Sequence, residues 1–182
     1  MFYTGKGDNG TTTTFGCDQR LSKSSAIAEA LGSLDETNSI LGVLRAHPRL
    51  PGVEVCDVNL KDILLGIQQD LFIIQAELAG ADKKTKEESV KKLENYVNFC
   101  EEQMPQIQTF LIPGADEISA YFDLARTVSR RTERRVVAVS DEGSLKLSDH
   151  TLAYLNRLSS ALYAFVRYIN FLYGAEEIAP KY

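Results

Sequence analysis

The sequence has little of the chemistry on which many enzymes depend. Its 182 residues include two histidines, three cysteines and no tryptophan. Neither His47 nor His150 lies three residues after a glutamate, which excludes the Glu-x-x-His pairs of di-iron helical bundles. The cysteines Cys17, Cys56 and Cys100 form no Cys-x-x-Cys motif, and their odd number leaves no disulfide framework to propose. No zinc site and no cysteine–histidine catalytic pair is therefore predicted.

Positive charge and long apolar runs are also scarce. The formal net charge is -5 at pH 7, whereas basic patches dominate most nucleic-acid-binding proteins. No apolar run reaches the length of a membrane span, and the polar N-terminus lacks the pattern of a signal or transit peptide. We therefore expect a cytoplasmic protein that binds neither nucleic acid nor a membrane. A single domain over residues 1–182 is expected from the length.

Apolar residues recur at helical spacing in five stretches, and strand signals are weak. The stretches are 24–45, 60–78, 90–104, 121–139 and 148–172. Ser148 or Asp149 is the expected N-cap of the last helix, and Gly174 its C′ residue. Weak strand signals lie at 11–15 and 136–139. These patterns predict an all-α fold, an antiparallel five-helix bundle over 24–174, between a non-helical arm over 1–23 and a tail over 175–182.

A dense group of arginines lies on the predicted fourth helix. Like charges four residues apart, such as Arg126 and Arg130, destabilise a helix by a few tenths of a kcal/mol per pair. Acidic groups or an anionic ligand should therefore compensate. Arg126, Arg130 and Glu133 share one helical face, while Arg131 and Arg135 lie on a rotated one. The shared face could bind a polyphosphate, with Glu133 either paired to Arg130 or assisting Mg²⁺; the alternative is a solvated basic face.

The N-terminal arm combines glycines, threonines and lysines. Glycines such as Gly7 and Gly10 let backbone N–H groups approach an anion, hydroxyls add donors, and Lys23 supplies a charge. A Walker A motif is absent. The arm is thus a candidate phosphate site, with a flexible tail as the alternative. Asn156 lies beside the apolar stripe of the fifth helix and could form a hydrogen bond with a ligand or a neighbouring helix. Asp35 lies beside the apolar stripe of the first helix and could pair with one of the arginines.

A series of short motifs occurs in a characteristic order along nearly the whole chain. They are Tyr3-Thr4, Gly7-Asp8 and Gly10-Thr11 in the arm, residues 20–23 and 34–38, Ile67-Gln68, Leu71-Phe72, residues 110–114, the arginine segment 125–135 and residues 154–159. In these motifs the chain resembles the PduO-type ATP:cob(I)alamin adenosyltransferases, also called corrinoid adenosyltransferases. The resemblance implies a ferritin-like five-helix bundle that assembles as a homotrimer with ATP at the subunit interfaces.

The resemblance also implies the reaction. Co(I) of a reduced corrinoid, cob(I)alamin, attacks the ribose 5′ carbon of ATP, and adenosylcobalamin and triphosphate are formed with the help of Mg²⁺. Because cobalt is the nucleophile, the protein needs none. A cobalamin reductase and a downstream adenosylcobalamin-dependent enzyme would be its candidate partners.

The resemblance assigns roles to individual residues. The phosphates would be held by Thr4, Gly7, Asp8, Gly10, Thr11 and Lys23. Arg126 would pair with Asp35 of a neighbouring subunit, and Arg130 would bind the triphosphate. Glu133 would organise the site with Mg²⁺, and Asn156 would contact the nucleotide. Phe110 would occupy the lower face of the corrin and displace the axial ligand; the alternative is a loop residue anchored in the core.

The chain departs from the family pattern at a few positions. These are Gly5-Lys6 in the arm, Cys17, Ala115 and Asp123, where arginine-threonine, glycine, glycine and histidine are common. Lys6 keeps a positive charge, so we expect ATP binding to be retained. The changes at Ala115 and Asp123 suggest a second hypothesis, a bundle that binds ATP or delivers adenosylcobalamin without efficient catalysis. A third is a purely structural helical oligomer.

Overall fold

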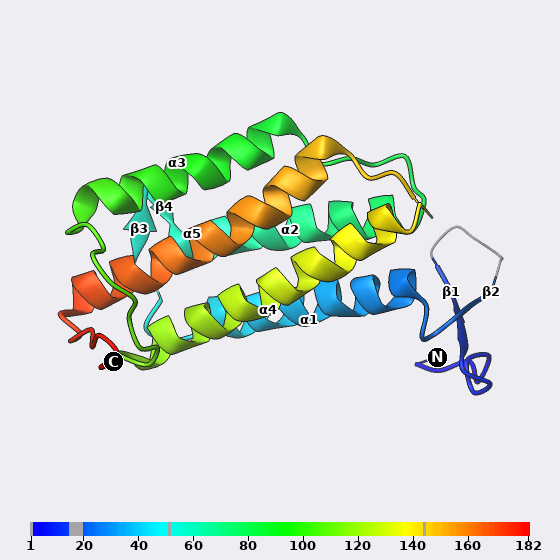
Figure 1. The fold of residues 1–182 in the computed structure, drawn as a ribbon, viewed down its shortest axis with the longest axis horizontal. Coiled ribbons are helices and arrows are strands. Elements are labelled where there is room, and N and C mark those ends of the chain that lie inside the picture. Colours follow the sequence, from blue (N-terminus) through cyan, green and yellow to red (C-terminus); the bar gives the residue numbers. More distant parts are fainter. Residues whose placement is uncertain (1, 15–19, 51, 144) are drawn as a thin grey trace.

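The computed structural model describes residues 2–14, 20–50, 52–143 and 145–182. The predicted five-helix, all-α bundle is confirmed (Figure 1). The helices are α1 (Ala26–Ala46), α2 (Leu60–Leu78), α3 (Glu87–Gln103), α4 (Glu117–Asp141) and α5 (Asp149–Tyr173). Two short antiparallel hairpins complete the described fold, β1 (Thr11–Thr13) with β2 (Arg20–Ser22) and β3 (Glu54–Val55) with β4 (Val58–Asn59). None of the described helices is long and apolar enough to cross a membrane.

Local signals set the ends of α5 as predicted. The hydroxyl of Ser148, the N-cap, accepts a hydrogen bond from the backbone N–H of Thr151. Gly174 adopts the left-handed conformation at the other end, with φ 62°. A side chain with a Cβ is strained in that conformation, which explains the glycine. The helix between them is almost fully buried along one face, so it forms the centre of the bundle.

The buried face of α4 differs from the prediction. The helix begins at Glu117, and Ile118 and Phe122 are fully buried. Tyr121 and Leu124, expected on the apolar stripe, are 37% and 48% exposed. That expectation was wrong because the first buried turn lies before Tyr121 and shifts the buried face around the helix.

Two further expectations need correction. Residues 136–139, a weak strand signal, lie inside α4, where Val136 and Val139 pack into the core. Leu172, expected on the buried stripe of α5, is 45% exposed. The strand signal at 11–15 is confirmed for Thr11–Thr13, and residue 15 lies outside the described residues.

Helices α1 and α4 are joined by a buried hydroxyl network. The hydroxyl of Thr132 donates to the carbonyl of Ser33 at 2.9 Å and lies 2.8 Å from the hydroxyl of Thr37. Both threonines are fully buried. Because buried polar groups must be paired, this network fixes the register between the two helices.

The arm and the C-terminus lie at opposite ends of the bundle. Figure 1 shows the β1–β2 hairpin beyond the start of α1, whereas the connection from α3 to α4 and the C-terminal tail lie at the other end. An α-helix rises about 1.5 Å per residue, so the 25 residues of α4 separate these ends by roughly 35 Å. Functional residues on the two ends of one chain are therefore far apart.

Candidate functional site

The arm folds into a turn followed by a hairpin. Gly10 donates its N–H to the carbonyl of Gly7 at 3.1 Å, and Lys23 donates its N–H to the carbonyl of Gly10 at 2.9 Å. Gly5 and Gly10 have positive φ values of 68° and 78°, a conformation that glycine adopts without strain. The turn thus brings Gly7, Gly10, Thr11 and Lys23 of the predicted phosphate site together.

Lys23 lies directly against Gly7. A Cβ on Gly7 would come within 3.1 Å of the Lys23 ammonium nitrogen and 3.2 Å of the Thr11 carbonyl oxygen. The absence of a side chain at position 7 therefore makes room for the ammonium beside the turn. Thr4 and Asp8, also expected to hold phosphate, belong to the same exposed turn; Thr4 accepts a hydrogen bond from the N–H of Lys6.

Arg20 organises the arm, although its sequence motif gave it no role. Its Nε donates to the Thr11 hydroxyl at 2.6 Å and its Nη2 to the Thr11 carbonyl at 3.1 Å. The same Nη2 donates to the carbonyl of Lys6. Arg20 on β2 thereby ties the glycine turn to β1. Its position within the motif at 20–23 was the available signal. Cys17, a departure noted in the sequence, lies outside the described residues.

Two of the clustered arginines are neutralised by α1. Arg131 pairs with Glu36 at 2.5 Å, and Arg135 pairs with Glu29 at 2.5 Å and also donates to the Ser33 hydroxyl. These pairs lie on the face rotated away from Arg130. They provide the acidic compensation expected for part of the like-charge cluster. Exposed pairs of this kind stabilise by up to about 1 kcal/mol each.

Glu133 and Asn156 are brought together from different helices. The amide nitrogen of Asn156 on α5 donates to Oε1 of Glu133 on α4 at 3.0 Å. The amide oxygen of Asn156 accepts from Arg157 at 2.7 Å, and Arg157 in turn pairs with Glu94 at 3.0 Å. Among the described residues no ion pair joins Glu133 to Arg130. The exposed Arg130 guanidinium therefore remains available beside a carboxylate whose position is set by α5.

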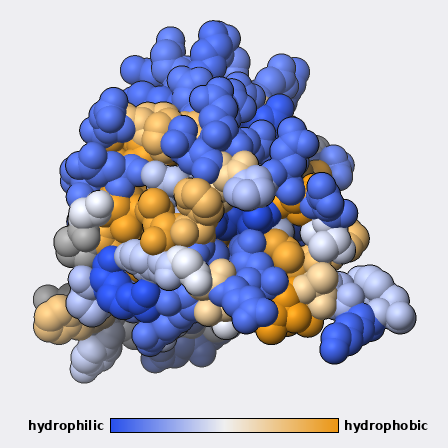
Figure 2. Space-filling model, turned by 90° about the vertical axis from the view of Figure 1, so that its left-hand side faces the viewer, coloured by the Kyte–Doolittle hydropathy of each residue, from blue (hydrophilic) through white to orange (hydrophobic). Residues whose placement is uncertain are grey.

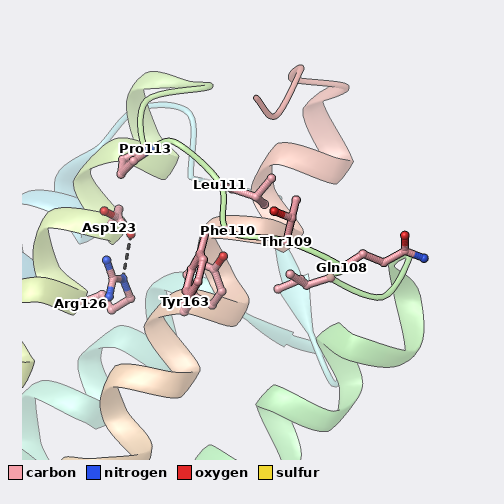
Figure 3. A pocket seen from close by; sticks show the side chains of 9 residues that line it. Gln108, Thr109, Phe110, Leu111, Pro113, Asp123, Arg126 and Tyr163 are labelled. Carbon is pink, nitrogen blue, oxygen red and sulfur yellow. Dashed lines mark hydrogen bonds and ion pairs between the residues drawn. The ribbon is translucent and has the colours of Figure 1, made fainter. Parts of the chain in front are cut away.

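A cavity of about 680 Å³ lies under the connection between α3 and α4. Figure 3 shows Phe110 and Tyr163 projecting into the same region, with Asp123 and Arg126 on its far wall. The complete lining is Ile107, Gln108, Thr109, Phe110, Leu111, Pro113, Asp123, Arg126 and Tyr163. Phe110 is 79% exposed, so the alternative of an anchor in the core is wrong. Such a large, mainly aromatic and aliphatic hollow suits a sizeable apolar ligand.

Asp123 holds Arg126 against the cavity. The carboxylate lies 2.8 Å from Arg126 Nε, and the guanidinium carbon lies 5.6 Å from the centre of the Tyr163 ring. The two charged side chains are 11% and 26% exposed. Asp35, the partner expected in a neighbouring subunit, is exposed on α1. Within one chain Arg126 therefore binds Asp123, and the Asp35 pair across subunits stays a prediction.

Asp70, on α2, is a second carboxylate that is partly buried. Burial is the main cause that raises the pKa of Asp70 above the usual carboxyl range, and the hydrogen bond that Ser89 donates to it at 3.2 Å opposes the shift. Burial also raises the pKa of Cys100 to about 12. No group of three or more histidine, cysteine or acidic side chains suited to a metal ion occurs within the described part of the chain. Cys100 is fully buried in the core, whereas Asp70 is half-buried.

Fold and geometry together define a helical bundle with two separate candidate ligand regions, the glycine-rich arm and an apolar cavity beside Arg126. The chain belongs to the cobalamin adenosyltransferase family, whose family model matches residues 2–169. It is 36% identical over 181 residues to the corrinoid adenosyltransferase of Bacillus subtilis. This match covers 97% of this chain and 90% of that protein. It is 37% identical over 172 residues to the corrinoid adenosyltransferase of Citrobacter freundii, spanning 91% and 92% of the two chains.

A solved structure agrees along the whole chain. A variant of the PduO-type ATP:corrinoid adenosyltransferase from Lactobacillus reuteri, complexed with cobalamin and ATP, matches with a TM-score of 0.87 and 28% identity. The match covers 100% of this chain and 97% of that one. The family resemblance predicted from the sequence motifs is thus confirmed.

Proposed function

We propose that this chain transfers the 5′-deoxyadenosyl group of ATP to Co(I) of a reduced corrinoid. The observation that carries the proposal is the cavity lined by Phe110, Tyr163 and the Asp123–Arg126 pair. The chain also carries a glycine-rich arm in which Lys23 lies against Gly7. The relatives are named for the same activity, and the solved neighbour contains cobalamin and ATP.

The chemistry requires positioning and charge stabilisation. As the cobalt–carbon bond forms, the bond between the 5′ carbon and its oxygen breaks, and triphosphate leaves with the bonding electrons. Negative charge therefore develops on that oxygen. Fixed positive groups that face it lower the barrier, and holding the 5′ carbon in line with cobalt removes much of the entropic cost. No protein nucleophile is consumed, which fits the scarcity of histidine and cysteine.

The phosphates are assigned to the arm and to one arginine of α4. Lys23 supplies a charge beside the turn at Gly7, and the backbone N–H groups and hydroxyls of the turn supply neutral donors. Arg130, exposed on α4, adds a planar fork suited to phosphate oxygens. Asn156 is assigned to the nucleotide, with its amide plane set by Glu133 and Arg157.

Glu133 is the candidate residue for Mg²⁺. Proteins commonly hold this ion through one or two carboxylates together with substrate phosphates and water. A single carboxylate beside an exposed arginine fits that mode, because Asn156 engages Oε1 of Glu133 and, among the described residues, no hydrogen bond or ion pair engages Oε2. When bound with ATP, the ion would neutralise charge on the triphosphate.

The complete site is assigned to an interface between subunits of a homotrimer. The arm and the connection between α3 and α4 lie at opposite ends of one chain (Figure 1). Because this connection lines the Phe110 cavity, one chain cannot bring its own arm to its own cavity. A neighbouring chain can supply the arm, and Asp35 of one subunit could then share Arg126 with Asp123. We place the enzyme in the cytoplasm, with a cobalamin reductase and an adenosylcobalamin-dependent enzyme as candidate partners.

A turnover assay tests the proposal. The purified protein is mixed with Mg·ATP and chemically reduced cobalamin, without oxygen or light, and formation of adenosylcobalamin and triphosphate is followed. Turnover that disappears in Arg130→Ala, with the helical content unchanged, is expected. Absence of turnover above a protein-free blank would refute the assignment.

A cofactor-delivery protein is the second candidate. The observation that favours it is Asp123, a carboxylate in the cavity that holds Arg126 within its own chain. Tight binding of ATP and adenosylcobalamin without triphosphate release would support this alternative.

A further inference from the structure

The C-terminal tail is tied back onto α5. After Gly174, the N–H of Ala175 donates to the carbonyl of Asn170 at 2.9 Å. Oε1 of Glu177 then lies 2.8 Å from Nε of Arg167 and accepts a hydrogen bond of 2.9 Å from the Asn170 amide. We call Arg167, Asn170 and Glu177 the tail latch. It fixes the tail four residues after α5 ends at Tyr173.

The tail latch is shielded from solvent. The side chains of Arg167 and Glu177 are 11% and 20% exposed, and Asn170 is 4% exposed. By comparison, Lys91 and Glu87 form an ion pair whose side chains are 64% and 58% exposed. The Asn170 amide gives Glu177 a charge-assisted hydrogen bond, and such bonds strengthen as solvent is excluded. Arg167 Nε lies at ion-pair distance from Glu177 but donates no hydrogen bond among the described residues. The latch is therefore a shielded attachment of the tail to α5.

The tail in turn holds the connection that carries Phe110. The carbonyl of Ile178, next to the latch, accepts a hydrogen bond of 2.8 Å from the N–H of Ile112. Within the described residues, this is the backbone–backbone hydrogen bond that ties positions 105–115 to the rest of the fold. Ile112 lies two residues after Phe110, so the tail fixes the backbone close to the exposed ring.

The contact between tail, α5 and connection is closely packed. The space left between them is about 20 Å³ and is lined by residues of all three segments, including Ile112, Arg167 and Glu177. This volume holds no more than one water molecule. Because the three segments are in contact, a displacement of the tail would be transmitted to the connection. Figure 2 views this end of the molecule, where hydrophobic patches interrupt a largely hydrophilic surface.

We infer that Glu177 is a positioning residue for the corrinoid. Through Arg167 and Asn170 it holds the tail, and the tail holds the connection so that Phe110 faces the lower side of the corrin. Phe110 is 79% exposed, so its own packing contributes little to its position. The inference rests on the proposed function, because it concerns the residue that would displace the axial ligand.

The test compares Glu177→Ala with the wild type and with Glu176→Ala, a matched control. Glu176 is exposed and forms no ion pair among the described residues. Three quantities are measured: kcat/KM for cob(I)alamin, the Kd of Mg·ATP, and the electron paramagnetic resonance spectrum of bound cob(II)alamin, which reports whether the lower axial nitrogen is coordinated.

For Glu177→Ala we expect kcat/KM for the corrinoid to fall at least tenfold and the axially coordinated fraction to rise, while the Kd of Mg·ATP stays within twofold. Glu177→Gln keeps an acceptor oxygen for Asn170 and should recover part of the loss. Corrinoid readouts equal to those of Glu176→Ala would overturn the inference. So would a parallel loss of ATP affinity, since it would show a general effect on the fold.

A truncated chain serves as a second variant in case Glu177→Ala does not fold. A chain that ends at Glu176 lacks both the latch carboxylate and Ile178, and the same corrinoid-specific loss is expected; wild-type corrinoid kinetics in this chain would overturn the inference. Wild-type protein without any turnover would refute the proposed function, whereas active wild type with an equally active Glu177→Ala would refute the latch alone.

Discussion

Gly7→Ala isolates the contribution of Lys23 to nucleotide binding. The added methyl group would lie 3.1 Å from the Lys23 ammonium and 3.2 Å from the Thr11 carbonyl. The ammonium is the end of a flexible side chain, whereas the carbonyl belongs to the hairpin backbone. The lysine should therefore give way by a few tenths of an ångström, and the close contact with the carbonyl should shift the turn by no more than that. We expect the variant to fold and to bind phosphate with a displaced Lys23 charge.

The size of the effect follows from the interaction removed. Complete loss of a hydrogen bond to a charged group costs about 1.5–3 kcal/mol, so displacement of the ammonium should raise the Kd of Mg·ATP measurably, by at most roughly 10- to 150-fold. Isothermal titration calorimetry measures this Kd. Gly32→Ala is the matched control, because a Cβ there meets no atom within 4 Å and alanine favours a helix; its Kd should be unchanged.

A double-mutant cycle tests the cause. If Gly7→Ala acts through Lys23, adding it to Lys23→Ala should change the Kd little further, because the two substitutions remove the same interaction. Fully additive losses would refute the reasoning, and so would wild-type affinity in Gly7→Ala. The first result would mean that the methyl group distorts the turn itself, and the second that Lys23 takes no part in binding.

Three further outcomes are expected. Asp123→Ala leaves Arg126 without its partner in α4. In urea titrations the free energy of unfolding should fall by about 1–3 kcal/mol, and KM for the corrinoid should rise. An unchanged KM would exclude Asp123 from the site. Thr132→Val removes one hydroxyl of the network with Ser33 and should cost about 1 kcal/mol, and an unchanged urea midpoint would contradict this. Burial raises the pKa of Asp70. Just above the usual carboxyl pKa, the folded protein therefore binds more protons than the unfolded chain. The free energy of unfolding then falls as the pH rises through that window. Asp70→Asn should flatten this part of the pH profile, and a profile equal to that of the wild type would show that Asp70 does not produce it.

The periodicity of apolar residues was sufficient to predict the five helices. The signals at Ser148 and Gly174 are local, because a cap forms within one turn of its own residue. The start of α4 was harder to predict. Its capping box pairs Asp116 with Ser119, whereas the usual sequence signature has glutamate or glutamine at the second position. With the first turn missed, the buried face was placed too close to Tyr121.

The candidate site was predicted residue by residue but not in its contacts. Helical spacing correctly separated Arg130 from Arg131, since the face of a residue follows from its number. The Asp123–Arg126 pair was missed although its i,i+3 spacing on one helix is a sequence signal. Spacing could not show that Glu133 binds Asn156, because that pairing depends on how α4 and α5 pack. The tail latch was missed for the same reason: a glutamate beyond the last helix carries no periodic signal.

The separation of the arm from the Phe110 cavity has a genetic consequence. If each site takes its arm from one subunit and its cavity from another, Lys23→Ala and Phe110→Ala damage different halves of the site. Mixing the two inactive proteins and allowing their subunits to exchange would place an intact arm of one parent beside an intact cavity of the other. Two alleles that each encode an inactive protein could then complement one another within a single oligomer.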